Sequence, residues 1–104
     1  MVGDIFTNLQ ELSLSHSNIT NDGLQFISLL PNLRMLDLSH TCVCIGLQHL
    51  ERLTGLRKLN LNNTSAYDDV LPHLEGSTAL EELDLSNTNI TDHNLCCLTN
   101  LTKL

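Results

Sequence analysis

Leucines recur along the chain in a regular pattern of hydrophobic and polar positions. Leu9, Leu33, Leu56 and Leu80 each open a six-residue block in which leucine fills the first, fourth and sixth positions and mostly polar residues fill the others. The blocks begin 24, 23 and 24 residues apart. Because self-similarity at a period of about 20–50 residues marks repeat architectures, this pattern predicts a stack of repeats.

Each block predicts one short strand followed by a turn and a short helical return. A leucine, polar, leucine alternation places both leucines on one face of a strand and the intervening residue on the other. No repeat can bury its apolar face alone, so we expect parallel strands stacked over a continuous leucine interior. Small hydroxyl residues follow each strand at equivalent positions, and we expect them to hydrogen-bond turn backbone across repeats: Ser17, Thr41, Thr64 and Thr88.

Helix-start signals precede three of the four returns. They are Thr20-Asn21-Asp22, Asp68-Asp69 and Thr91-Asp92, residue types that favour the first turn of a helix. The second repeat reads Cys44-Ile45-Gly46-Leu47 instead and is one residue shorter than the others. We expect its turn to be tighter.

The four blocks resemble the leucine-rich repeat family, whose core pattern is L-x-x-L-x-L followed by a polar and an apolar residue. The resemblance covers residues 9–104. It implies an α/β fold, a right-handed solenoid with a parallel β-sheet on its concave face and short helical returns on its convex face. The last full repeat, with Leu85-Ser86-Asn87-Thr88-Asn89-Ile90-Thr91-Asp92, looks like the intracellular Ser/Thr-type repeats of about 24 residues. It is also similar to the cysteine-containing repeats beside F-box domains, although Thr88 stands where those have cysteine.

The repeats divide the chain into a short leader and one repeat domain. We expect residues 1–8 to be an N-terminal cap or the tail of a preceding repeat, and residues 9–104 to be the leucine-rich repeat domain. The repeats are 9–32, 33–55, 56–79 and 80–103, with a fifth starting at Leu104. Repeat arrays need polar caps, and neither end shows one. We therefore expect a fragment of a larger protein, which on its own is marginally stable or self-associates through its uncapped ends.

Composition and charge narrow the class of partner. The chain has 24 leucines but only three aromatic residues, which argues against an aromatic-centred sandwich. Every 18-residue window contains polar residues, which argues against a membrane-spanning helix. A net charge of −7 disfavours nucleic acid and anionic membranes, because basic side chains supply most of that affinity. No signal peptide is visible, so we expect a cytoplasmic protein with free thiols.

The candidate binding surface is the outward face of the predicted sheet. Stacked strands are about 4.8 Å apart, so equivalent outward residues form columns with mixed charge, which suit a protein or peptide partner; the alternative is ordinary variation on a solvated surface. The columns are Glu11, Met35, Lys58 and Glu82, then Ser13, Asp37, Asn60 and Asp84, then Ser15, Ser39, Asn62 and Ser86, with Arg34 and Arg57 at the margin.

No pattern in the chain indicates a catalytic residue, a cofactor or a metal site. His16 and His40 are equivalent and should be neighbours, but zinc usually takes three or four ligands, and the column continues with asparagines. The cysteines form no C-x-x-C pair, and His93, three residues before Cys96, lacks an orienting third group. The N-x-Ser/Thr sequons arise from the repeat itself, and without a signal peptide we expect no glycans at Asn18, Asn62, Asn63, Asn89 and Asn100.

The resemblance implies a protein–protein interaction module that is not itself an enzyme. Recognition would use the concave face, with outward strand residues setting specificity. Two alternatives stay open. One is the substrate-recognition part of an enzyme, such as an F-box-type ubiquitin ligase or a leucine-rich repeat kinase; the other is a regulatory or surface leucine-rich repeat protein of a protist.

Overall fold

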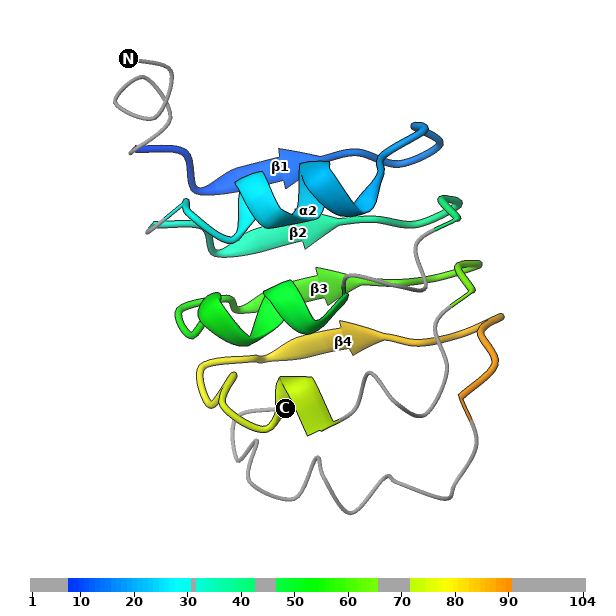
Figure 1. Ribbon diagram of the computed structural model, residues 1–104. Helices are drawn as coiled ribbons and strands as arrows, with labels where there is room; N and C mark the ends of the chain where they lie inside the picture. The colour runs from blue at the N-terminus through cyan, green and yellow to red at the C-terminus, as the bar shows by residue number, and fades with distance from the viewer. Residues whose placement is uncertain (1–7, 31, 43–46, 66–71, 91–104) are drawn as a thin grey trace.

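The strands of the protein form one open parallel sheet. The computed structural model describes residues 8–30, 32–42, 47–65 and 72–90 (Figure 1). Its four strands lie in chain order across the sheet, and they are β1 (Glu11–Ser13), β2 (Met35–Asp37), β3 (Lys58–Asn60) and β4 (Glu82–Asp84). In the register of the sheet, Leu12, Leu36, Leu59 and Leu83 lie side by side. The predicted stack of repeats with parallel strands is confirmed.

Helical returns cover one face of the sheet. They include α2 (Asn21–Ile27) and η1 (Leu47–Arg52), a 3₁₀ helix, and both lie on the same side of the strands (Figure 1). A single 3₁₀ turn over residues 72–74 follows before β4. Thr20 is the N-cap of α2, as predicted, but its hydroxyl makes no capping hydrogen bond. A 3₁₀ helix winds more tightly than an α-helix, and η1 lies in the repeat that is one residue shorter. No helix among the described residues has the length and apolarity to span a bilayer.

Other predicted features fall outside the described residues. They are the leader up to residue 7, the turn at 43–46 and the helix starts at 68–69 and 91–92.

The core lies between the sheet and the returns, and it is made almost wholly of leucine. The leucines of β2 and β3 and those just after them are at most 2% exposed: Leu36, Leu38, Leu59 and Leu61. They belong to one buried cluster with residues of the returns, among them Leu24, Ile27, Leu50 and Leu53. The equivalent leucines of β1 and β4 are only partly buried, because among the described strands each of these has a neighbour on one side only. Burial therefore depends on neighbouring repeats, as expected for a solenoid.

The hydroxyl column binds backbone within its own repeat. The side chains of Thr41, Thr64 and Thr88 each donate a hydrogen bond to the carbonyl oxygen three residues earlier, at 2.6 to 2.8 Å. The prediction that these hydroxyls reach across repeats is wrong, because the turn after each strand brings the preceding carbonyl within closer reach. At the equivalent position, the Ser17 hydroxyl is buried and has no hydrogen-bond partner among the described residues.

Candidate functional site

The open face of the sheet, which we define as the face opposite α2 and η1, carries the outward strand residues. The register places the predicted columns across the four strands as expected. The first column holds Glu11, Met35, Lys58 and Glu82, and the second holds Ser13, Asp37, Asn60 and Asp84. All eight side chains are exposed or partly exposed. Leucines between the two columns point to the core, so the outward side chains are not part of the apolar interior.

A shallow depression runs over β2, β3 and β4. This central hollow has a volume of about 310 Å³, and all three residues of each of these strands line it. Lys58 Nζ and Glu82 Oε2 lie 3.9 Å apart across it, and both side chains are more than half exposed. Exposed ion pairs add little to stability, so this pair is available to exchange partners.

The second column is held in place by its own backbone. One side-chain oxygen of Asp37, Asn60 and Asp84 accepts a hydrogen bond from the amide two residues further on, at 2.9 Å in each case. Asp and Asn favour such local bonds in turns. The side chains are therefore oriented before any partner arrives, which lowers the entropy cost of binding.

The Asp84 carboxylate accepts two hydrogen bonds from one residue, Ser86. The Ser86 hydroxyl donates to Asp84 Oδ1 at 2.5 Å, and the Ser86 amide donates to the same oxygen. These two bonds hold the pKa of Asp84 below its ordinary value, against an opposing effect of burial and with the least contribution from Asn62. The Asp84 carboxylate therefore stays ionised further into acid than an ordinary aspartate.

The sequence predicts that the third column faces solvent, and the structure differs from this prediction. The column consists of Ser15, Ser39, Asn62 and Ser86. Ser39 is only 5% exposed, and its hydroxyl lies 2.9 Å from that of Ser15. Asn62 Nδ2 donates to the Ser86 hydroxyl at 2.7 Å. The expectation of exposure is wrong at Ser39, because its side chain bonds the neighbouring repeat and its amide bonds Asp37. This column mainly joins repeats to one another.

Arg34 and Arg57 lie where the sequence places them, at the margin of the open face. Each immediately precedes its strand, and both side chains are exposed. The Arg57 amide donates to the Arg34 carbonyl oxygen at 2.7 Å, so the two residues are adjacent. They line a second depression, the margin hollow, of about 200 Å³, together with Gln10, Glu11, Met35, Lys58 and Glu81.

Four residues with a left-handed backbone conformation form a column just past the carboxyl ends of the strands, where each strand leads into a turn. Its φ angles are 54° to 63°, and its members are His16, His40, Asn63 and Asn87. Asn and His are among the non-glycine residues that adopt this conformation most readily. The two imidazole rings are stacked, with centroids 4.3 Å apart, which confirms that they are neighbours. The Asn63 side-chain amide bonds Nδ1 of His40 at 2.9 Å, so the column forms a polar ladder.

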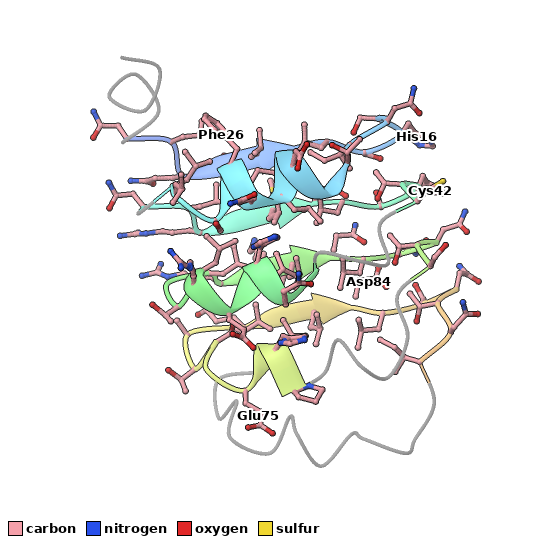
Figure 2. All side chains as sticks on the ribbon, viewed as in Figure 1. His16, Phe26, Cys42, Glu75 and Asp84 are labelled. Carbon is pink, nitrogen blue, oxygen red and sulfur yellow. The ribbon has the colours of Figure 1, made fainter. Side chains whose placement is uncertain are left out.

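The exposed thiol of Cys42 lies near the ladder. Cys42 is an exposed free thiol at the same end of the sheet as His16 (Figure 2). Within the part of the chain that the structure describes, no three His, Cys, Asp or Glu residues are placed to hold a metal ion. The other candidate residues for thiol chemistry, Cys44, His93, Cys96 and Cys97, lie outside that part. Of the five sequon asparagines, Asn100 lies outside it and Asn18, Asn62, Asn63 and Asn89 lie within it.

Sequence reasoning missed the side-chain bonds that organise this face. The spacing Asp37-x-Ser39, repeated in Asn60-x-Asn62 and Asp84-x-Ser86, is the signal that could have predicted the local turns. No feature of the sequence predicts that Ser39 is buried. The equivalent residues Ser15, Asn62 and Ser86 also carry small polar side chains, yet they remain partly exposed or exposed.

Comparisons with known proteins agree on the architecture. Two profiles described as leucine rich repeat match residues 7–65 and 79–101. No curated protein sequence matches the chain. Among solved structures, an internalin from Listeria monocytogenes is similar over 99% of this chain, with a TM-score of 0.65 and 23% sequence identity. The chain spans 35% of the length of that internalin, and a likeness at this identity shows the fold alone.

Proposed function

The chain belongs to the leucine-rich repeat family, and from that premise we propose that its open face binds a protein or peptide partner. The leucines serve as scaffold, and the outward side chains of the first and second columns set specificity. Solenoids commonly bind through such extended sheet surfaces.

One observation carries the proposal. The central hollow lies on regular strands, is lined by varied polar and charged side chains, and has its second column already oriented by backbone bonds. Sites built on rigid elements recognise a partner at a lower ordering cost than sites on loops. A surface that served only to keep the protein in solution would not need this ordered column.

A peptide-display selection against the 104-residue chain tests the proposal. The selected peptides are then measured on a variant in which the charges of the central hollow are exchanged, Lys58→Glu with Glu82→Lys. This exchange keeps the net charge and an opposite-charge pair. We expect the affinity of most selected peptides to fall about tenfold, because like charges now meet where opposite charges did.

The matched control exchanges two charges away from the open face, Arg52→Glu with Glu75→Lys. Arg52 belongs to η1, and both side chains are exposed. We expect peptide affinity to stay within twofold of the wild type. If the control weakened binding as much as the central exchange, the open face would not be the contact surface.

A further inference from the structure

We infer that the margin hollow binds a carboxylate of the partner between Arg34 and Arg57, and that the same partner segment carries a basic residue toward Asp37 and Asp84. The inference rests on the proposed function, because it names the chemistry of the segment that the open face would bind. It predicts an extended peptide with an acidic and a basic residue a few positions apart.

The two arginines are placed to act together. Their backbones are joined by hydrogen bonds from Arg57 and Lys58 to the Arg34 carbonyl, at 2.7 and 3.0 Å. Among the described residues, neither guanidinium forms a salt bridge. Adjacent strands are about 4.8 Å apart, so two like charges face solvent side by side. A carboxylate between them would relieve their repulsion and accept charge-assisted hydrogen bonds from both.

The surroundings of the arginines favour one carboxylate over a more highly charged anion. Glu11 and Glu81 line the same hollow, one at each side of the arginine pair in the order of the repeats. Their charges oppose a run of acidic residues, and they oppose a phosphate more than a carboxylate because a phosphate carries more charge. The hollow therefore selects a single acidic group.

The central hollow supplies the other half of the recognition. Met35 and Lys58 line both depressions, so the two hollows are adjacent. Beyond them Asp37 and Asp84, the last residues of β2 and β4, give the central hollow two carboxylates, and the Ser86 hydroxyl donates a hydrogen bond to that of Asp84. A strand rises about 3.3 Å per residue, which puts Arg34 and Asp37 about 10 Å apart along the chain. A segment lying along the strands in the extended polyproline II conformation, which has three residues per turn and rises about 3.1 Å per residue, would match them with an acidic residue and a basic residue three positions away on the same side.

Libraries of eight-residue peptides test this assignment. One position is fixed as Glu, Gln or phosphoserine, the others are randomised, and binding is measured on the 104-residue chain. We expect the Glu library to be enriched over the Gln library and to select Lys or Arg three positions from the Glu. Individual Glu peptides should bind about tenfold more weakly to each of the variants Arg34→Gln and Arg57→Gln.

Arg52→Gln is the matched control, because it removes the same charge from η1, away from the open face. We expect it to leave affinity within twofold. Equal enrichment of the Glu and Gln libraries, or equal losses at Arg52, would overturn the carboxylate assignment. Preference for the phosphoserine library would overturn it in favour of a phosphorylated partner.

Different results would contradict the proposed function and the carboxylate assignment. If Gln peptides bind as well as Glu peptides and lose affinity when Lys58 and Glu82 are exchanged, the open face binds peptides without the carboxylate contact. If no selected peptide responds to any change on the open face, both proposals are wrong.

Discussion

Thr41 and Ser17 hold equivalent positions after β2 and β1, yet among the described residues only the threonine hydroxyl has a hydrogen-bond partner. Thr41 Oγ1 donates to the Leu38 carbonyl at 2.6 Å in a buried site. We expect Thr41→Ala to lower the free energy of unfolding by about 1–3 kcal/mol, because it leaves that carbonyl without this donor and empties the space of a methyl group. Urea denaturation of the 104-residue chain measures the change.

Ser17→Ala is the control for Thr41→Ala. The Ser17 hydroxyl is buried without a partner among the described residues, so its removal should change stability by less than about 0.5 kcal/mol or raise it slightly. Equal losses in the two variants would show that the hydrogen bond to the strand carbonyl is not what stabilises the turn.

Asp84 makes the stability of the folded chain depend on pH in the acid range. Its pKa is lowered, first by the Ser86 hydroxyl and then by the Ser86 amide. The folded state therefore favours the ionised carboxylate. This contribution to stability is fully present above the carboxylate's ordinary pKa in the unfolded chain, and it is lost as the pH falls through the lowered folded value. We expect Ser86→Ala to move the pKa of Asp84 upward, as measured by NMR titration of the carboxyl carbon.

Asp37 is the comparison for the Ser86→Ala titration. Its side chain accepts a backbone hydrogen bond two residues on, like that of Asp84, and it does not contact Ser86 in any described hydrogen bond. The chemical shift of its carboxyl carbon at neutral pH should be unchanged in the variant. If the Asp84 pKa did not move, the hydroxyl would not be the main cause of its shift.

At the scale of the element, equivalent strands contribute unequally to stability. Leu36 in β2 is fully buried, whereas Leu12 in β1 is partly buried. We expect Leu36→Ala to cost about 2–5 kcal/mol and Leu12→Ala roughly half as much, because less apolar surface returns to water. Urea denaturation of both variants measures the difference. A cost for Leu12→Ala as large as that for Leu36→Ala would mean that β1 has packing partners beyond those described.

The strands and the turns that follow them show how much of the structure the sequence could predict. Spacing between leucines predicted the strand positions and their register, because burial of one strand face admits only one alternation. The same spacing placed Arg34 beside Arg57 and His16 beside His40. It could not predict that Ser39 is buried or that Thr41 bonds within its own repeat, because serine and threonine hydroxyls can reach several backbone and side-chain partners from one position. Which partner they choose depends on turn geometry, which the leucine pattern leaves open.

At the scale of the whole molecule, the basic residues are unevenly distributed. The net charge is −7, yet three of the five basic residues, Arg34, Arg57 and Lys58, lie together on or beside the open face. Electrostatic steering depends on such local patches rather than on net charge alone. A partner with an isolated acidic group would meet attraction at the margin hollow and repulsion over most of the remaining surface, which favours one docking orientation.

The β1 edge of the sheet predicts self-association of the 104-residue chain. An almost wholly apolar hollow of about 250 Å³ lies there, lined by side chains from around β1 and from α2, among them Phe26. Phe26 lies on α2 beside β1 (Figure 2) and is 43% exposed. Apolar surface next to an unpaired strand edge promotes contact between copies. We expect concentration-dependent oligomers in sedimentation velocity, and a shift toward monomer in Phe26→Lys.

Leu29→Lys is the matched control for Phe26→Lys. Leu29 follows α2 and is 63% exposed, but it does not line the apolar hollow. Both variants add the same charge at neighbouring positions, so general repulsion between copies affects them equally. Only Phe26→Lys places an ammonium group where burial against a second copy would require its desolvation, which is costly for an unpaired charge. Equal shifts in the two variants, or a wild-type chain that stays monomeric at high concentration, would show that this edge is not an interface between copies.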